Sequence, residues 1–270
     1  MKQENLNLLA WDVPKTQTQP VREALSPFLI YHKEIKSFLP NGPHNRLLLH
    51  PRIQEVEHLP ANVIQLCQSH GSQHTPYQLD GVPPTVIEQL WTVVFFSKSK
   101  ASPPLTNRLP DNWQQVLSNF YPTQIEIEGA TYATVEHYFQ GQKALASTKP
   151  EMADWFSADN DGPNSIDSDS AAAKKAGSRK AYQQHGAMLD MALWETQRVA
   201  AMQTALNNRY FQDVLFQKVL NSPKGMKLLQ FERSGARSFW GGNFSKKTGE
   251  AVGENMLGQL LMQIRDQGAS

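Results

Sequence analysis

The sequence predicts an α+β fold, in which a helix-rich single domain with a small β-sheet follows an irregular N-terminal extension. Prolines interrupt the short apolar runs of residues 1–88, and such spacing disfavours long regular elements. Strand-like alternation is confined to short segments before residue 130, whereas helix-like periodicity dominates the chain after it. We therefore assign a loop-rich extension of unknown role to residues 1–88 and the main domain to residues 89–270.

In the extension, prolines recur from Pro14 to Pro84. The apolar runs between them predict short strands and one or two short helices, packed on the main domain. Histidines in this region match no common zinc spacing, and no pair of thiols accompanies them. We expect ordinary surface or hydrogen-bonded histidines, and no metal site, at these positions: His44, His50, His58, His70 and His74.

Two strands are expected in the first part of the main domain. Residues 91–96 are rich in β-branched and aromatic side chains, as buried strands are. Residues 124–129 alternate between polar and apolar side chains and end at a glycine, which predicts a half-buried strand followed by a hairpin turn. Thr134 is then a suitable N-cap for a helix that carries Glu136 in its first turn.

The rest of the chain is predicted to be mostly helical. Residues 157–170 are acidic, rich in small residues and without periodicity, which indicates a flexible surface loop. Helices are predicted over residues 171–184, with a weak point at Gly177, and over residues 190–210 and 213–220. The last helix carries an apolar stripe with a period of about 3.6 residues, formed by Met256, Leu257, Leu260, Leu261 and Ile264.

The composition is that of an ordinary globular protein. Of the 270 residues 40% are hydrophobic and 19% charged, and the formal net charge of +1 provides no global attraction to nucleic acid. The single cysteine, Cys67, excludes an internal disulfide, is expected to be buried, and fits a reducing compartment. No apolar run approaches the roughly 18 residues of a membrane helix, and the first residues lack the apolar core of a signal peptide. A cytoplasmic protein without membrane contact is expected.

Motifs of several enzyme classes are missing from the sequence. It contains no phosphate-binding loop, no dinucleotide fingerprint and no nucleophile elbow. No cofactor is therefore expected.

Two segments carry side chains that could form a catalytic or binding site: residues 117–122 (LSNFYP) and residues 135–143 (VEHYFQGQK). A turn-like stretch with exposed Asn and Phe side chains leads into a helix whose positive N-terminal end should keep Glu136 ionised. An ionised carboxylate beside amide and aromatic groups suits a catalytic or ribose-binding centre. Glu136, Gln140 and Lys143 share one helix face. The alternative is a solvated polar face, where replacing Glu136 would cost under about 1 kcal/mol.

These two segments resemble the signature of the NADAR family, also known as the riboflavin-intermediate N-glycosidase family. Similar pieces recur in the family's order from about residue 92 to about residue 266, roughly two thirds of the chain. One position departs from the pattern, because Arg237 stands where the family usually has an Asp, three residues before the second Trp. The further similar pieces are residues 94–96, residues 177–179, Trp194, Met202, residues 205–206, Glu232, residues 240–241 and residues 255–265.

The resemblance implies a metal-independent N-glycosidase. It would cleave the bond between a ribose, as phosphoribose or ADP-ribose, and an amino-heterocycle such as a riboflavin-pathway aminopyrimidine or a modified guanine. Cleavage builds positive charge on the ribose, which a fixed carboxylate stabilises. Glu136 is the expected base or electrostatic stabiliser, and Lys143 is the second expected catalytic residue. Substrate-binding roles are expected for Ser118, Asn119, Phe120, Tyr138, Trp194, Arg237, Trp240, Gly241 and Asn255.

Several of these residues have alternative roles. Trp194 and Trp240 could stack on a planar base or fill the core; the two roles are balanced for Trp194, and the glycines after Trp240 favour the site. Arg237 could grip a phosphate with two hydrogen bonds, or its presence could weaken hydrolysis.

The expected partner is a small-molecule ribosylated base or an ADP-ribosylated nucleic acid, with no obligate protein partner. Two other functions stay open. The chain could be a non-catalytic ADP-ribose or NAD sensor, because Arg237 replaces an acid. It could also be an interaction protein that uses residues 1–88 and keeps the glycosidase-like domain as a scaffold.

Overall fold

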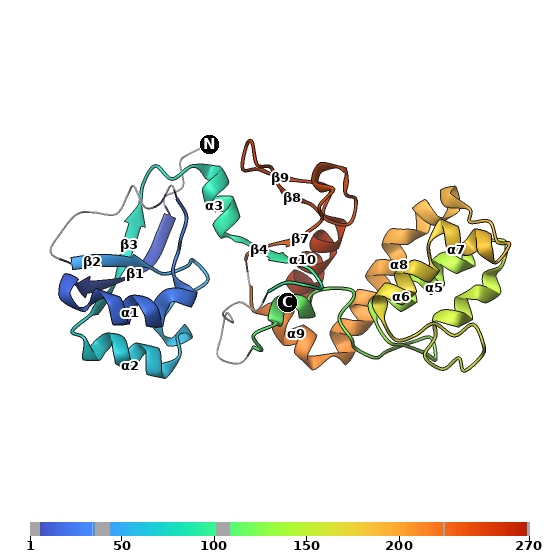
Figure 1. The fold of residues 1–270 in the computed structure, drawn as a ribbon, viewed down its shortest axis with the longest axis horizontal. Helices are drawn as coiled ribbons and strands as arrows, with labels where there is room; N and C mark the ends of the chain where they lie inside the picture. The colour runs from blue at the N-terminus through green and yellow to red at the C-terminus, as the bar shows by residue number, and fades with distance from the viewer. Residues whose placement is uncertain (1–5, 34, 36–43, 101–108, 224, 269–270) are drawn as a thin grey trace. The chain divides into compact units, whose positions relative to one another are not determined.

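The computed structural model describes residues 6–33, 35, 44–100, 109–223 and 225–268, and shows an α+β protein (Figure 1). The chain forms two compact units, each built from segments that are distant in the sequence. Unit 1 comprises residues 1–94, 100–113 and 222–256, and unit 2 comprises residues 95–99, 114–221 and 257–270. Each compact unit thus combines several stretches of the chain and not one continuous stretch. The domain boundary between residues 88 and 89 stays a prediction.

A three-stranded antiparallel sheet opens unit 1. Its central strand, β1 (Leu6–Pro14), lies between β2 (His44–Leu48) and β3 (Gln73–Leu79). Asp12 of β1 accepts hydrogen bonds from Arg46 Nε at 2.7 Å and from Thr75 Oγ1 at 3.0 Å. The three strands are therefore tied together by side chains as well as by the backbone ladder.

The side chains of β1 alternate between two cores, because successive residues of a strand point to opposite faces. Leu6, Leu8 and Ala10 belong to one buried cluster, whereas Trp11 and Val13 belong to the other. Both faces of the strand are therefore covered. The helices that contribute to these clusters are α1 (Thr18–Leu25) and α2 (Ala61–Ser69) on the Trp11 side and α3 (Pro84–Leu90) on the other.

Residues 6–94 contain more regular structure than the prolines suggested, so the expectation of an irregular, loop-rich extension understated this region. Pro60 directly precedes α2 and Pro84 is the first residue of α3. Proline is tolerated at the start of a helix, where its missing N–H would have no partner. These prolines therefore mark element ends. Cys67 is fully buried, as expected, and burial raises the pKa of its thiol to about 11.

The later segments of unit 1 are short strands and turns. The strand expected at residues 91–96 is confirmed as β4, and it pairs with β7. A second two-stranded sheet consists of β8 and β9, which follow the 3-10 helix η6. The bounds are β4 (Thr92–Phe95), β7 (Lys227–Gln230), η6 (Gly235–Arg237), β8 (Asn243–Phe244) and β9 (Ala251–Val252).

Unit 2 is organised around α5 (Val135–Leu145), the helix that carries Glu136. The 3-10 helix η5 (Pro150–Phe156) and helices α6 (Ser170–Ala176) and α8 (Met191–Gln212) pack against it, as Figure 1 shows for the helices. Residues 135–141 are all buried. A helix buried on all sides belongs to the core of a domain, so α5 has no solvated polar face along these turns.

Most of the remaining elements follow the predictions, whereas the short helix α4 was not predicted. The hairpin is confirmed, with Glu128 and Gly129 in its turn at positive φ. The weak point at Gly177 is confirmed as the end of α6, and another helix, α7, begins two residues later. The bounds are α4 (Trp113–Val116), β5 (Ile125–Ile127), β6 (Ala130–Tyr132), α7 (Arg179–Gln184), α9 (Val214–Asn221) and α10 (Met256–Gly268).

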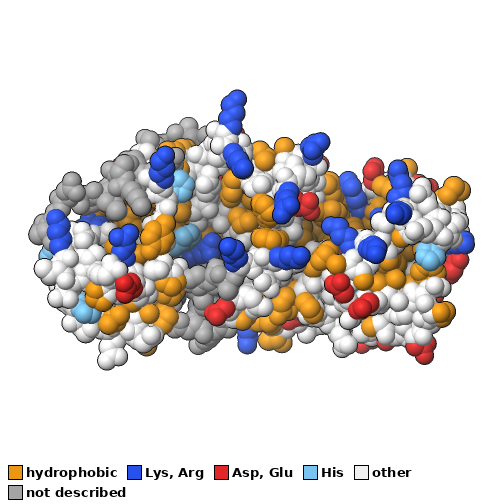
Figure 2. All heavy atoms as spheres, in the orientation of Figure 1, with side chains coloured by type: hydrophobic (Ala, Val, Ile, Leu, Met, Phe, Trp, Pro, Cys, Tyr) orange, Lys and Arg blue, Asp and Glu red, His pale blue; other side chains and the backbone are white. Residues whose placement is uncertain are grey.

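Two surface properties bear on the environment of the protein. None of the helices within the described residues combines the length and hydrophobicity that a bilayer crossing requires. Some large apolar side chains are exposed, among them Phe211 and Met188, and hydrophobic side chains are visible between charged ones on the face drawn in Figure 2.

The N-cap of α5 provides the first prediction. Thr134 is fully buried, and its hydroxyl oxygen lies 3.3 Å from the His137 N–H and 2.8 Å from His137 Nδ1. Thr134→Ala should lower the free energy of unfolding by about 1–2 kcal/mol, because a cap and a buried hydrogen bond are lost together. Thr134→Ser, which keeps the hydroxyl, should retain most of the stability. Denaturant unfolding of the two variants checks this, and equal losses would contradict it.

Candidate active site

The Ser-Asn-Phe segment is held by its backbone carbonyls, each bonded to a different part of unit 2. The Ser118 carbonyl accepts from Arg209 Nη1 of α8 at 2.9 Å, and the Asn119 carbonyl accepts from the Glu136 N–H of α5 at 3.1 Å. The Phe120 carbonyl accepts from the Ser170 hydroxyl of α6 at 2.8 Å. Three helices therefore determine where this loop presents its side chains.

Arg209 is the most buried of these anchors, with no exposed surface. Its guanidinium also pairs with Asp213 at 3.3 Å and lies 4.1 Å from the centre of the Phe216 ring. Burial lowers the pKa of Arg209 to about 10, and the Asp213 carboxylate opposes that shift. The side chain therefore stays charged at neutral pH and makes a strong hydrogen bond to the loop.

Glu136 lies beneath this loop and is only 4% exposed. One carboxylate oxygen accepts from Asn119 Nδ2 at 2.5 Å, and the other accepts from Gln140 Nε2 at 2.8 Å. The alternative of a solvated polar face is wrong, because the first turn of α5 is buried, and η5, α6 and α8 pack against this helix. Asn119 is also buried, and so its expected exposure is wrong as well.

The pKa of Glu136 shifts in the direction opposite to the one expected from the helix dipole. Burial raises the pKa of its carboxyl, while the hydrogen bond from Gln140, the charges of Lys174 and Lys143 and the hydrogen bond from Asn119 all oppose that rise. Removal from water therefore outweighs these four favourable interactions. Such a carboxyl accepts a proton more readily than a solvated glutamate does.

Lys143 lies on the same helix face, two turns further on. Its Nζ donates to the Gly177 carbonyl at 2.6 Å and lies 5.9 Å from the centre of the Tyr182 ring. Burial lowers the pKa of Lys143, the Glu136 charge raises it, and the Arg179 charge lowers it. Glu136 and Lys143 are thus electrostatically coupled without forming a direct ion pair.

Gly177 has two functions at this site. Besides accepting from Lys143, it leaves room for Gln140, because a Cβ on Gly177 would lie 1.8 Å from Gln140 Oε1. That amide oxygen is buried, and none of the described residues hydrogen-bonds to it. The site therefore contains an unused acceptor next to the Glu136 carboxylate.

The neighbour of Glu136, His137, fixes the start of the helix. Its Nε2 lies 2.8 Å from the Asp167 carbonyl, which can only accept, so we assign the ring proton to Nε2. Nδ1 then accepts from the Thr134 hydroxyl at 2.8 Å. Burial lowers the pKa of His137, against the Asp167 carbonyl and the charges of Asp169 and Asp167, which keeps the ring in this neutral form.

Other candidates in unit 2 surround the centre or support it. Phe120 is half-buried, with Lys174 Nζ 5.5 Å from its ring centre, whereas Ser118 accepts from the Phe120 N–H and shapes the turn. Trp194 is buried and packs edge-on against Phe139 at 4.9 Å, which favours its core role. Tyr138 is buried against Tyr132 at 5.2 Å, and burial raises its pKa to about 12.

Four candidates belong to unit 1: Arg237 ends η6, Trp240 and Gly241 follow it, and Asn255 directly precedes α10. Arg237 is exposed, and Trp240 is half-buried with its ring 5.0 Å from that of Phe239. A Cβ on Gly241 would lie 2.5 Å from the Gln230 carbonyl oxygen, so close packing within the chain is enough to explain the glycine at this position.

Asn255 has a similar internal use. It has positive φ, and its side-chain amide donates to the Leu228 carbonyl at 2.7 Å and accepts from the Gln230 N–H at 3.0 Å. We therefore treat Asn255 as a residue that shapes unit 1.

Sequence reasoning did not assign site roles to Gln140, Lys174, Gly177, Ser170 or Arg209. The i, i+4 spacing from Glu136 was a usable signal for Gln140, and the predicted break at Gly177 was a weak one. Lys174, Ser170 and Arg209 reach the site through tertiary packing, and no local pattern identifies them.

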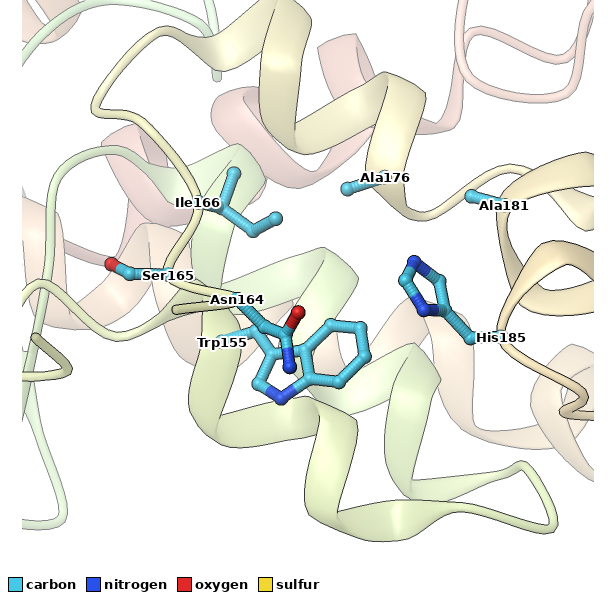
Figure 3. Close-up of a pocket in the computed structure, with 7 residues that line it drawn as sticks. All are labelled: Trp155, Asn164, Ser165, Ile166, Ala176, Ala181 and His185. Atoms are coloured by element: carbon cyan, nitrogen blue, oxygen red, sulfur yellow. The ribbon is translucent and has the colours of Figure 1, made fainter. Parts of the chain in front are cut away.

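A cavity of about 230 Å³ lies elsewhere in unit 2 (Figure 3). Its walls include the Trp155 indole and the His185 ring, whose centres are 4.8 Å apart. Glu136 does not line it.

In the described part of the chain, no group of three or more His, Cys, Asp or Glu side chains could hold a metal ion. The expected lack of a metal stays a prediction.

Gly177→Ala tests the coupling between α6 and the carboxylate. The new methyl group should displace Gln140 and leave Glu136 short of one donor, at a cost of about 1–3 kcal/mol in unfolding free energy. Backbone strain is not expected, because φ at Gly177 is −80°. In a double-mutant cycle, Gly177→Ala should cost little when Gln140→Ala is already present. Additive losses would show that Gly177 does not act through Gln140.

Glu136→Gln tests the pKa assignment. With a raised folded-state pKa, the native protein keeps a proton that the unfolded chain has already released, so stability is full at acid pH and falls as pH rises through that window. The free energy of unfolding of the wild type relative to Glu136→Gln should therefore decrease with rising pH above the ordinary glutamate pKa. Denaturant titrations at several pH values measure this, with Glu151→Gln, at an exposed position, as control. A difference that does not change with pH would contradict the assignment.

Comparisons with known proteins give this geometry a context. The family model for the NADAR domain matches residues 96–267. "N-glycosidase YbiA" of Escherichia coli (strain K12) is 28% identical over 150 residues, covering 56% of this chain and 79% of that protein. "N-glycosidase Npun_R5314" of Nostoc punctiforme is 28% identical over 157 residues, covering 57% and 87%.

More distant similarities have lower coverage or structural agreement. "Riboflavin biosynthesis protein VVA0006" of Vibrio vulnificus is 26% identical over 160 residues, covering 58% of this chain and 36% of that protein. The NMR structure of E. coli YbiA aligns with a TM-score of 0.45 at 25% identity, over 66% of this chain and 84% of that one. Because the family model spans well over half of the sequence and includes the buried Glu136 centre, the chain belongs to the NADAR domain family.

Proposed function

We propose that this protein is an N-glycosidase that hydrolyses the bond between a ribose and an amino-heterocycle, with Glu136 as its catalytic carboxylate. The observation that carries the proposal is the burial of that carboxylate between two amide donors, Asn119 and Gln140. Relatives named N-glycosidases, in E. coli and Nostoc punctiforme, support the reaction class at family level.

The energetics favour a chemical role over a structural one. A carboxylate that only complements a helix dipole gains its free energy at the surface, whereas burying it costs several kcal/mol unless strong partners compensate. No described residue forms a direct ion pair with Glu136, and its partners are two neutral amides. Perturbed buried carboxylates of this kind are concentrated at functional sites.

The reaction follows from the chemistry of this group. As the bond from the anomeric carbon to nitrogen breaks, the electron pair leaves with the heterocycle and positive charge develops on the ribose. The Glu136 carboxylate stabilises that charge and takes a proton from the attacking water, whose oxygen bonds to the anomeric carbon. The proton that Glu136 takes from the water is finally delivered to the departing nitrogen, so one water is consumed and the products are a free ribose hydroxyl and an amine.

The surrounding groups suit a ribosylated substrate. The unused Gln140 Oε1 acceptor could receive a hydrogen bond from a ribose hydroxyl, and Lys143 could neutralise negative charge on a phosphate or the departing group. We propose that Asn119 positions the carboxylate and that Phe120 contacts the substrate. Arg237 and Trp240 are proposed to bind phosphate and base, respectively.

We propose two substrate classes: phosphoribosylamino-pyrimidines, for which the name of the Vibrio vulnificus relative is the support, and ADP-ribosylated guanine. The reaction is proposed to need no metal, so turnover should withstand EDTA. A reducing compartment such as the cytoplasm fits the single buried thiol.

The decisive experiment is a mass-spectrometric turnover assay on both substrate classes. Wild type should release the base from at least one of them, and Glu136→Gln should lose at least about 10²-fold, the usual contribution of a general base. Glu151→Gln is the matched control. Because burial raises the Glu136 pKa, the acid limb of kcat/KM should lie above the ordinary range of a glutamate. Full activity in Glu136→Gln would exclude Glu136.

The second candidate function is an ADP-ribose or NAD sensor without turnover. It is favoured by Arg237, an exposed side chain at the position where the family usually has an Asp. The same assay separates the two functions, because a sensor would bind ADP-ribose and release no base from either substrate. An interaction role for residues 1–88 is tested by comparing the partners captured with and without this segment.

A further inference from the structure

A tight turn after β2 holds an arginine, Arg52, that pairs with no acid among the residues the structure describes. The His50 carbonyl accepts from the Ile53 N–H at 2.7 Å, which closes a turn with Pro51 and Arg52 at its centre. Proline presets the backbone of such a turn. The Arg52 N–H lies 3.3 Å from His50 Nδ1, so the two residues are also linked to each other.

The guanidinium of Arg52 lies over a buried indole. Its Cζ is 5.7 Å from the Trp113 ring centre, and Trp113 has no exposed surface. Nε is buried and has no hydrogen-bond partner in the described part of the chain, while the residue as a whole stays partly exposed. Burial lowers the pKa of Arg52 to about 10, so its charge persists at neutral pH.

The contrast with other arginines of this chain is informative. Arg46 pairs with Asp12 at 2.7 Å, and the fully buried Arg209 pairs with Asp213 at 3.3 Å. Arg52 forms no ion pair within the described residues. A partly desolvated cation without a counter-charge is costly, and a bound anion would remove that cost.

We infer that Arg52 is the centre of an anion-binding site in unit 1 that takes a phosphoryl oxyanion. A guanidinium presents parallel N–H donors that match two oxygens of a phosphate. His50 adds a second donor, because its Nδ1 accepts from the backbone and its proton therefore lies on Nε2. The turn fixes both residues before the anion arrives, so little ordering is required on binding.

The test is thermal unfolding of the full chain with inorganic phosphate, with chloride at equal ionic strength as reference and acetate as a carboxylate probe. Phosphate should raise the Tm of the wild type in a saturable way, acetate should raise it less, and Arg52→Met should abolish the rise. Arg22→Met is the matched control, because it removes an exposed charge from the same unit and should keep the rise.

A local measurement keeps the inference testable if Arg52→Met does not fold. The imidazole NMR signals of His50 in the wild type should shift on addition of phosphate, and Arg52→Lys should weaken the response at least several-fold. Equal Tm shifts in wild type and Arg52→Met would place the anion elsewhere. The absence of any phosphate effect on Tm or on the His50 signals would leave Arg52 a purely structural cation and overturn the inference.

Discussion

The burial of the Glu136 carboxylate is the constraint on which the arrangement of unit 2 depends. A carboxylate removed from water needs donors from several directions, and one helix cannot supply them all. Gln140 comes from the same helix, whereas Asn119 comes from the preceding loop, 17 residues earlier in the sequence. The loop must therefore be held accurately against the helix. Its three carbonyl anchors, on α8, α5 and α6, accomplish this.

The same constraint explains why small and polar residues occur where core packing alone would favour apolar ones. Gly177 makes room for Gln140, and its carbonyl receives Lys143. Thr134 caps α5 from a fully buried position, and His137 joins that cap to the Asp167 carbonyl. Each of these residues satisfies a backbone or side-chain group that burial of the first turn would otherwise leave unpaired. The polar residues thus form a support around one acid.

Two ionisable side chains without a direct ion pair among the described residues, Glu136 and Arg52, lie in different units. Glu136 has only neutral amides as hydrogen-bond partners, and Arg52 has no acid within the described residues. Other charged side chains form direct ion pairs, as Arg46 does with Asp12 and Arg209 does with Asp213. Where a fold pairs some buried charges and leaves others open, the open ones are the better candidates for ligand contact.

Local sequence patterns determined most of the secondary structure in unit 2. Three signals act within a few residues and can be recognised without tertiary contacts: the alternation at residues 124–129, the cap at Thr134 and the break at Gly177. In the first 94 residues the prolines obscured a three-stranded sheet, because strand pairing joins residues 30 or more positions apart and no local signal reports it.

The site shows the same division. The positions of Glu136, Gln140 and Lys143 on one helix face, and the resemblance of the surrounding motifs, were available from the sequence alone. The environment of Glu136 was decided by tertiary structure, since η5, α6 and α8 pack against α5, and burial of the carboxyl raises its pKa. A residue's chemical type is encoded where it stands in the chain, but its protonation depends on what the fold packs around it.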